Sequence, residues 1–110
     1  MWFIFPQLSG LGHSAMAQRY AIRNLAEARC YLADPVLGPR LRRDVGLVMT
    51  HTNKTAREIF GAPDDLKFRS CLTLFREAAD DESERTLFTK ALDQFYDAGP
   101  DPHTLELLQT

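Results

Sequence analysis

Residues 68–79, FRSCLTLFREAA, decide the fold of this chain. Their apolar side chains recur at intervals of three and four residues, which places them on one face of an α-helix. This is the strongest amphipathic pattern in the sequence, and we predict that it forms the central helix of the protein. The apolar face consists of Phe68, Cys71, Leu72, Phe75, Ala78 and Ala79.

The first two predicted helices lie between residues 24 and 49. Asn24 and Glu27 resemble a capping box and begin a short helix. It ends before Pro35, because the residue that precedes a proline is disfavoured in the helical conformation. Asp34 then serves as the N-cap of a second helix, with Pro35 as its first residue. The apolar stripe of the second helix is Leu37, Leu41, Val45, Val48 and Met49.

Two more helices flank the central one. Thr55 and Glu58 form a capping box for a short helix that Gly61 ends. After the central helix, Asp81 and Ser83 compete to cap the next one. The side chains that this helix should bury are Phe88, Ala91, Leu92 and Phe95.

A short terminal helix begins at Asp101-Pro102, which combines an N-cap with a proline in the first turn. Leu105 and Leu108 should dock it on the core. The sequence contains no hairpin turn and no βαβ unit. We therefore predict an all-α protein, one domain over residues 1–110, with about six or seven short helices.

The chain opens with five apolar residues, MWFIF. Burial of each large apolar side chain is worth about 1.5–3 kcal/mol, so these residues should not remain in water. We expect this extended segment to pack into or against the core, to line a pocket, or to cover a second copy of the chain. The last arrangement predicts a homodimer through Trp2–Phe5.

The net charge of -2 conceals two halves of opposite sign. Residues 1–57 hold eight Lys or Arg against three acids, and residues 58–110 hold five against twelve. We interpret the halves as surfaces that attract each other or are simply solvated. A nucleic-acid surface is disfavoured, since it would need six arginines on one face. These are Arg19, Arg23, Arg29, Arg40, Arg42 and Arg43.

Composition also bears on location and cofactors. The longest apolar run is far shorter than the roughly 18 residues of a membrane span, and no export signal accompanies it. Cys30 and Cys71 lack a metal-binding spacing, and His13, His51 and His103 are isolated. We expect a cytoplasmic protein with reduced, mostly buried thiols, no metal and no cofactor.

Two short motifs carry the candidate chemistry. GLGHSA, residues 10–15, is half of a dinucleotide-binding fingerprint, but without a βαβ unit it predicts only close backbone approach and an anion at a helix beginning at Ser14. Ser14 is either an ordinary cap or a cap that also touches a ligand. Lys67-x-x-Ser70 places an ammonium and a hydroxyl on the central helix. Its alternative interpretation is a lysine lying along its own helix beside a serine bonded to the preceding turn.

Two functions are consistent with these motifs. The first is a non-catalytic binding or interaction domain. The second is a small enzyme or sensor for a phosphorylated, nucleotide-like ligand of the ADP-ribose type, which requires Lys67 and Ser70 to reach residues 7–14 around an open cavity. Whether the protein is an enzyme is left open. The candidate ligand-binding residues are Trp2, Gln7, Gly10, Gly12, His13, Ser14, Lys67 and Ser70.

Several segments resemble one bacterial family over nearly the whole chain. They are MWFIFPQLSGLGHSAMAQRYAI, EARCYLADPVLGPRL, IFGAPDDLKFRSCLTLF and DPHTLELL. They resemble the domain-of-unknown-function-1810 family, sometimes called calpastatin-like, and WFIFPQ and KxxSxxTLF are the most specific. The resemblance implies an α-helical fold, no settled activity, and a further N-terminal segment in most members. Phe68 and Cys71 depart from the small or aliphatic residues of the family.

Overall fold

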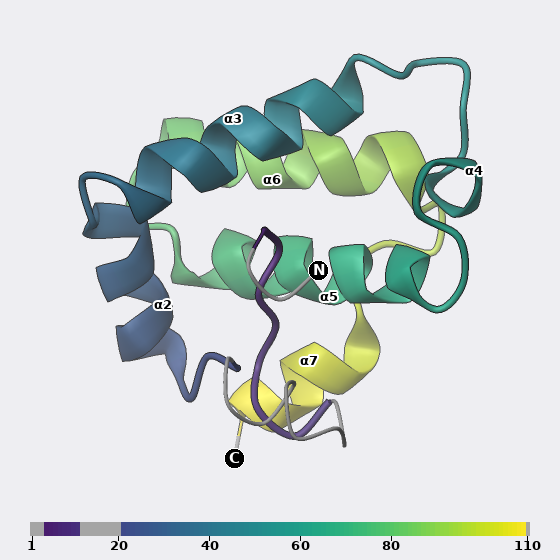
Figure 1. The fold of residues 1–110 in the computed structure, drawn as a ribbon. Helices are drawn as coiled ribbons and strands as arrows, with labels where there is room; N and C mark the ends of the chain where they lie inside the picture. The colour runs from purple at the N-terminus through teal and green to yellow at the C-terminus, as the bar shows by residue number, and fades with distance from the viewer. Residues whose placement is uncertain (1–3, 12–20, 110) are drawn as a thin grey trace.

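A computed structural model describes residues 4–11 and 21–109 of the chain. The described residues contain six helices, so the predicted all-α fold is confirmed (Figure 1). One isolated parallel bridge joins Leu8 to Ile22. In chain order the helices are α2 (Leu25–Ala33), α3 (Leu37–Met49), α4 (Ala56–Phe60), α5 (Asp64–Ala78), α6 (Glu82–Phe95) and α7 (Pro102–Leu108).

Helix α5 is the predicted central helix. It packs against α2, α4, α6 and α7, while α3 lies over α6 and contacts α2 (Figure 1). Because neighbours cover α5 on several sides, its buried surface is wider than the single stripe that the sequence predicted. The buried residues of α5 are Phe68, Ser70, Cys71, Leu72, Thr73, Leu74, Phe75 and Ala78.

Most helix starts follow the predicted capping residues. The side chain of Asn24 accepts a hydrogen bond from the backbone N–H of Glu27 at 2.9 Å. Thr55 and Glu58 form the reciprocal bonds of a capping box, and Gly61 ends α4 with φ of 75°. Asp81, rather than Ser83, caps α6. These helix ends are therefore determined by local side-chain to backbone hydrogen bonds.

The start of α3 differs from the prediction. The helix begins at Leu37 instead of Pro35. One carboxylate oxygen of Asp34 accepts from the N–H groups of both Val36 and Leu37 at 2.9 Å. These bonds hold residues 34–36 in a turn before the helix, and they lower the pKa of Asp34.

The terminal helix also differs in detail. It begins at Pro102 behind the Asp101 cap, as predicted. Its contact with the core, however, is made by Leu107 and Leu108 rather than by Leu105 and Leu108.

An aromatic cluster lies around Phe68, which is fully buried. The ring centroid of Phe5 lies 4.7 Å from that of Phe68, and the centroid of Phe60 lies at 4.9 Å. Phe95 completes the cluster at 6.2 Å. Such edge-on and tilted ring pairs contribute about 0.5–1.5 kcal/mol each beyond their buried area. The segment that contains Phe5 is therefore held against α5.

The expectation for the apolar opening is confirmed in part. Phe5 is 4% exposed and belongs to the core. Ile4 is 47% exposed, so the expectation of burial is wrong at this position. Trp2 and Phe3 lie outside the described residues.

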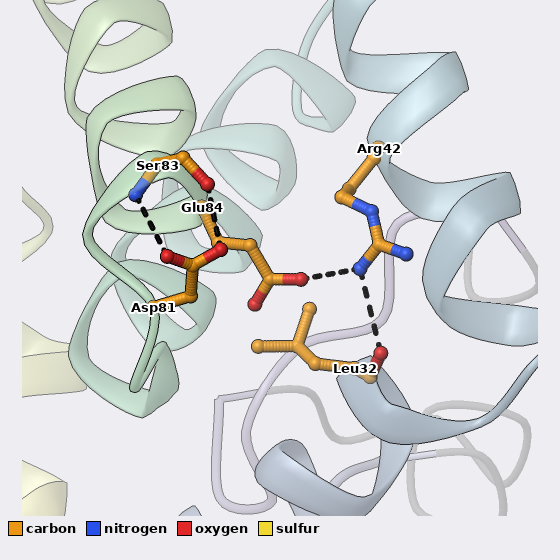
Figure 2. Close-up of polar contacts among 5 residues, drawn as sticks. All are labelled: Leu32, Arg42, Asp81, Ser83 and Glu84. Carbon is orange, nitrogen blue, oxygen red and sulfur yellow. Dashed lines mark hydrogen bonds and ion pairs between the residues drawn. The ribbon is translucent and has the colours of Figure 1, made fainter.

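The two oppositely charged halves meet through ion pairs. Arg42 of α3 donates to Glu84 of α6, and the same nitrogen donates to the carbonyl of Leu32 at 3.4 Å (Figure 2). Arg29 lies 3.6 Å from Asp80. These contacts support the interpretation that the halves attract each other. Of the six arginines that a nucleic-acid surface would need, Arg19 lies outside the described residues. Arg29 and Arg42 are paired with Asp80 and Glu84.

Two further expectations concern cysteines and membranes. Both cysteines are free; Cys71 is buried as expected, whereas Cys30 is exposed, because it lies on the outward side of α2. Within residues 4–11 and 21–109, no helix has the length and apolarity to cross a bilayer.

Gly38 allows α3 to pack closely against the end of α2. A Cβ at this position would lie 2.1 Å from the carbonyl oxygen of Leu32, so an alanine must push the two helices apart. Gly46, in the same helix, has nothing within 4 Å of such a Cβ.

We predict opposite effects of alanine at these two glycines. Gly38→Ala should lower the free energy of unfolding by about 1–3 kcal/mol, because it overpacks the helix contact. Gly46→Ala should raise it by up to about 1 kcal/mol through helix propensity. Urea denaturation of both variants measures the difference, and a Gly38→Ala variant as stable as the original protein would contradict the packing.

Candidate ligand-binding pocket

A buried polar network docks α7 on α5. One carboxylate oxygen of Asp101, Oδ2, accepts from the hydroxyl of Ser70 at 3.0 Å. It also accepts from the backbone N–H and the hydroxyl of Thr104, at 3.1 and 2.6 Å. The backbone N–H of Asp101 donates to the hydroxyl of Thr73 at 2.8 Å. The first turn of α7 is thus fixed to polar side chains that α5 has buried.

Arg69 of α5 holds the loop that leads into α7. Its guanidinium donates to the carbonyls of Gly99 at 2.8 Å and Pro100 at 3.0 Å. The guanidinium carbon also lies 5.9 Å from the centre of the Tyr96 ring. Together with the Asp101 network, these bonds hold the loop against α5.

A pocket of about 390 Å³ lies beside this network. It is bounded by the segment of residues 7–11, by one side of α5 and by the start of α7. This volume is within the range of small-ligand sites. Its polar lining consists of Gln7, Lys67, Ser70, Asp101 and His103, and its apolar wall consists of Leu11, Pro63 and Leu66.

Gln7 is the most unusual of the lining residues. It is only 4% exposed, and its backbone carbonyl accepts from the N–H of Ile22 at 2.9 Å. Its side-chain amide makes no hydrogen bond to any residue that the structure describes. Buried polar groups in proteins nearly always have a partner, which can be water or a ligand. Because Gln7 lines the pocket, such a partner can bind there.

Asp101 uses its two carboxylate oxygens differently. While Oδ2 accepts three hydrogen bonds, Oδ1 has no hydrogen-bond partner within the described part of the chain. Asp101 thus holds α7 through one oxygen, and the residue also lines the pocket.

In the Lys67-x-x-Ser70 motif, the serine is bonded to the preceding turn of its own helix, as one of the two interpretations of the motif predicted. Ser70 donates toward the carbonyl of Leu66, one turn back, at 3.1 Å, as well as toward Asp101. Because a hydroxyl has one hydrogen, these two acceptors already use its donor capacity. Lys67 forms an ion pair with Asp64 at 3.5 Å. Both residues of the motif also line the pocket.

The structure brings only some of the predicted site residues together. Gln7, Lys67 and Ser70 line one pocket, so Lys67 and Ser70 do reach Gln7 around a cavity. Gly10 lies apart from that lining, with φ of 100° and the side chain of Leu107 beside it. The remaining candidates, Trp2, Gly12, His13 and Ser14, lie outside the described residues.

Two pocket residues were missed by the sequence analysis. Asp101 was assigned only a capping role, and His103 was dismissed as isolated. The sequence Asp101-Pro102 predicted the start of α7, but no local pattern indicates that this turn lies in the same pocket as Gln7 and Lys67.

A second hollow of about 580 Å³ lies between residues 8–9, the start of α2 and the end of α7. Its lining includes Arg23, which is exposed and paired with Glu27. The lining of the smaller pocket includes two buried polar residues, Gln7 and Ser70, so we regard that pocket as the candidate site.

Two side chains that pack on or within α5 have raised pKa values. Burial raises the pKa of the Cys71 thiol well above its usual value. Burial, followed by the nearby charge of Asp65, raises the pKa of Tyr96. Both groups therefore remain protonated at neutral pH and are poor nucleophiles. The described residues also contain no group of three potential metal ligands.

Residues 1–108 match the family described as "Protein of unknown function (DUF1810)". Among solved structures, the chain is similar to the conserved hypothetical protein Rv1873 from Mycobacterium tuberculosis, with a TM-score of 0.92 and 46% sequence identity. The similarity covers 99% of this chain and 76% of that one. No curated protein matches the sequence.

We predict that the Thr104 hydroxyl is needed to dock α7. Thr104→Val keeps the shape of the fully buried side chain but removes a donor to a carboxylate, so it should lower the free energy of unfolding by about 1.5–3 kcal/mol. Thr86→Val, on the exposed side of α6, is the matched control and should change it by less than about 0.5 kcal/mol. Equal effects in chemical denaturation would contradict the role of the network.

Proposed function

Since the chain belongs to the DUF1810 family, whose function is unknown, we propose its function from the geometry of the pocket. The family membership confirms the resemblance noted in the sequence. The protein is a small-molecule-binding domain, formed by residues 1–110, that holds a compact polar ligand between residues 7–11, α5 and α7.

The observation that carries this proposal is the side chain of Gln7. Gln7 is 4% exposed and lines the pocket, and its side-chain amide has no hydrogen-bond partner among the described residues. A ligand in the pocket would supply hydrogen bonds to this amide. The polar groups of Asp101 and Lys67 on the same wall give the ligand further points of attachment.

Binding without catalysis agrees best with the side chains present. The Ser70 hydroxyl donates toward the carbonyl of Leu66 and toward Oδ2 of Asp101, and that oxygen also accepts two hydrogen bonds from Thr104, so both groups are engaged in docking α7. Neither the family description nor the similar structure supports a phosphorylated, nucleotide-like ligand. Asp101 would also repel the phosphates of such a ligand.

We predict that Gln7→Met separates stability from binding. Methionine fills the same space without polar atoms, so the ligand-free variant should be more stable than the original protein by about 1 kcal/mol. Its melting temperature should respond less than that of the original protein to any ligand found in a thermal-shift screen of sugars, amines, carboxylates and nucleotides. Gln109→Met, at an exposed position, is the control and should change neither quantity.

Two results would contradict the proposal. A Gln7→Met variant that is less stable without ligand would mean that the amide has a structural role. A ligand that raises the melting temperature of Gln7→Met as much as that of the original protein would bind elsewhere.

Self-association is a second candidate function. Ile4 is a large apolar residue that is 47% exposed directly before the buried Phe5. A homodimer through Trp2–Phe5 would cover it.

The two free thiols support a location in a reducing compartment such as the cytoplasm.

We predict that light scattering will show a mass that rises toward twice the monomer with protein concentration. Ile4→Ser should weaken this association, because it removes apolar surface from the interface. Val36→Ser, at another exposed apolar position, is the control. A monomer at every concentration would exclude self-association.

A further inference from the structure

We infer that the ligand of this pocket is a small zwitterion that carries an ammonium group, a carboxylate and an apolar side chain, as a free amino acid does. The inference rests on the proposed function and names the chemistry of the same site.

Asp101 is the group that would receive the ammonium. Its Oδ2 is saturated by the hydroxyl of Ser70 and by two donors of Thr104, which fixes the carboxylate in place. Its Oδ1 has no hydrogen-bond partner within the described part of the chain, and none of the ion pairs found there includes Asp101. A carboxylate fixed on the pocket wall attracts a cationic N–H donor more strongly than a neutral one.

Lys67 and Gln7 are the groups that would receive the carboxylate. Lys67 lines the pocket with an ammonium that has three N–H donors and pairs with Asp64 at 3.5 Å. The amide of Gln7 adds two N–H donors in a buried position. Donors to a carboxylate and an acceptor for an ammonium thus lie on the wall of one pocket.

Simpler charged ligands fit this arrangement less well. An anion without an ammonium would meet the unneutralised carboxylate of Asp101. An amine without a carboxylate would leave the amide of Gln7 with no acceptor for its donors. Only a ligand with both groups satisfies both ends of the polar wall.

The remaining wall is apolar. Leu11, Pro63 and Leu66 line it, and Leu66 is 57% exposed in the protein without ligand. An apolar side chain of the ligand would cover part of this surface. The pocket volume of about 390 Å³ is near the lower end for ligand sites, which suits a molecule of this size.

The test compares three matched probes on the intact protein. L-leucine carries both charged groups, 3-methylbutylamine lacks the carboxylate, and 4-methylpentanoate lacks the ammonium. Binding is followed by the backbone amide NMR signals of Gln7, Ser70 and Asp101. We expect leucine to shift these signals and each of the other two probes to bind at least about tenfold more weakly, since each loses a charged hydrogen bond.

A pair of variants locates the carboxylate contact. Lys67→Met should weaken leucine binding by about tenfold while leaving 3-methylbutylamine unchanged. Lys54→Met, at an exposed lysine outside the pocket, is the control and should change neither. A uniform loss of binding of both probes in Lys67→Met would contradict the assigned contact.

The failure of this inference can be told apart from the failure of the proposed function. If leucine and the other standard amino acids leave these signals unchanged while a sugar, an amine or a carboxylate shifts them, the zwitterion is wrong and the binding pocket stands. If no compound of either set shifts them, both are wrong.

Discussion

The structure depends on the burial of α5 on several sides. A helix with one apolar stripe needs only one neighbour, but α5 contacts α2, α4, α6 and α7. Its polar residues Ser70 and Thr73 are therefore removed from water along with its aromatic residues. Since buried hydroxyls must be hydrogen-bonded, each lies within bonding distance of a carbonyl one turn back, Leu66 or Arg69, and another part of the chain supplies their further partners.

The start of α7 supplies these partners, and this requirement links the fold to the site. Asp101 bonds both to Ser70 and, through its backbone, to Thr73. The same residue caps α7 and lines the pocket. A network that exists to satisfy buried groups of α5 thus also positions a carboxylate where a ligand can reach it, and small changes in the docking of α7 would alter the site.

The outer helices are held by different forces. Gly38 lets α3 approach the end of α2 closely, and Arg42 then bonds to Leu32 and to Glu84 of α6 (Figure 2). This corner joins the basic and acidic halves of the sequence on the side of α5 away from α7. The pocket side is stabilised by buried hydrogen bonds, whereas this corner combines close packing with a partly exposed ion pair.

The sequence by itself determined the helices, because caps and apolar periodicity act over three or four residues. Asn24, Thr55 and Asp101 each mark a helix start that the structure retains. Local bonds could still mislead, as the turn at Asp34 delays α3 by two residues. Only the tertiary structure decided the pocket: Ser70 and Asp101 are 31 residues apart, and Gln7 is farther still from His103. Their meeting depends on how helices cover α5, and no local pattern encodes that contact.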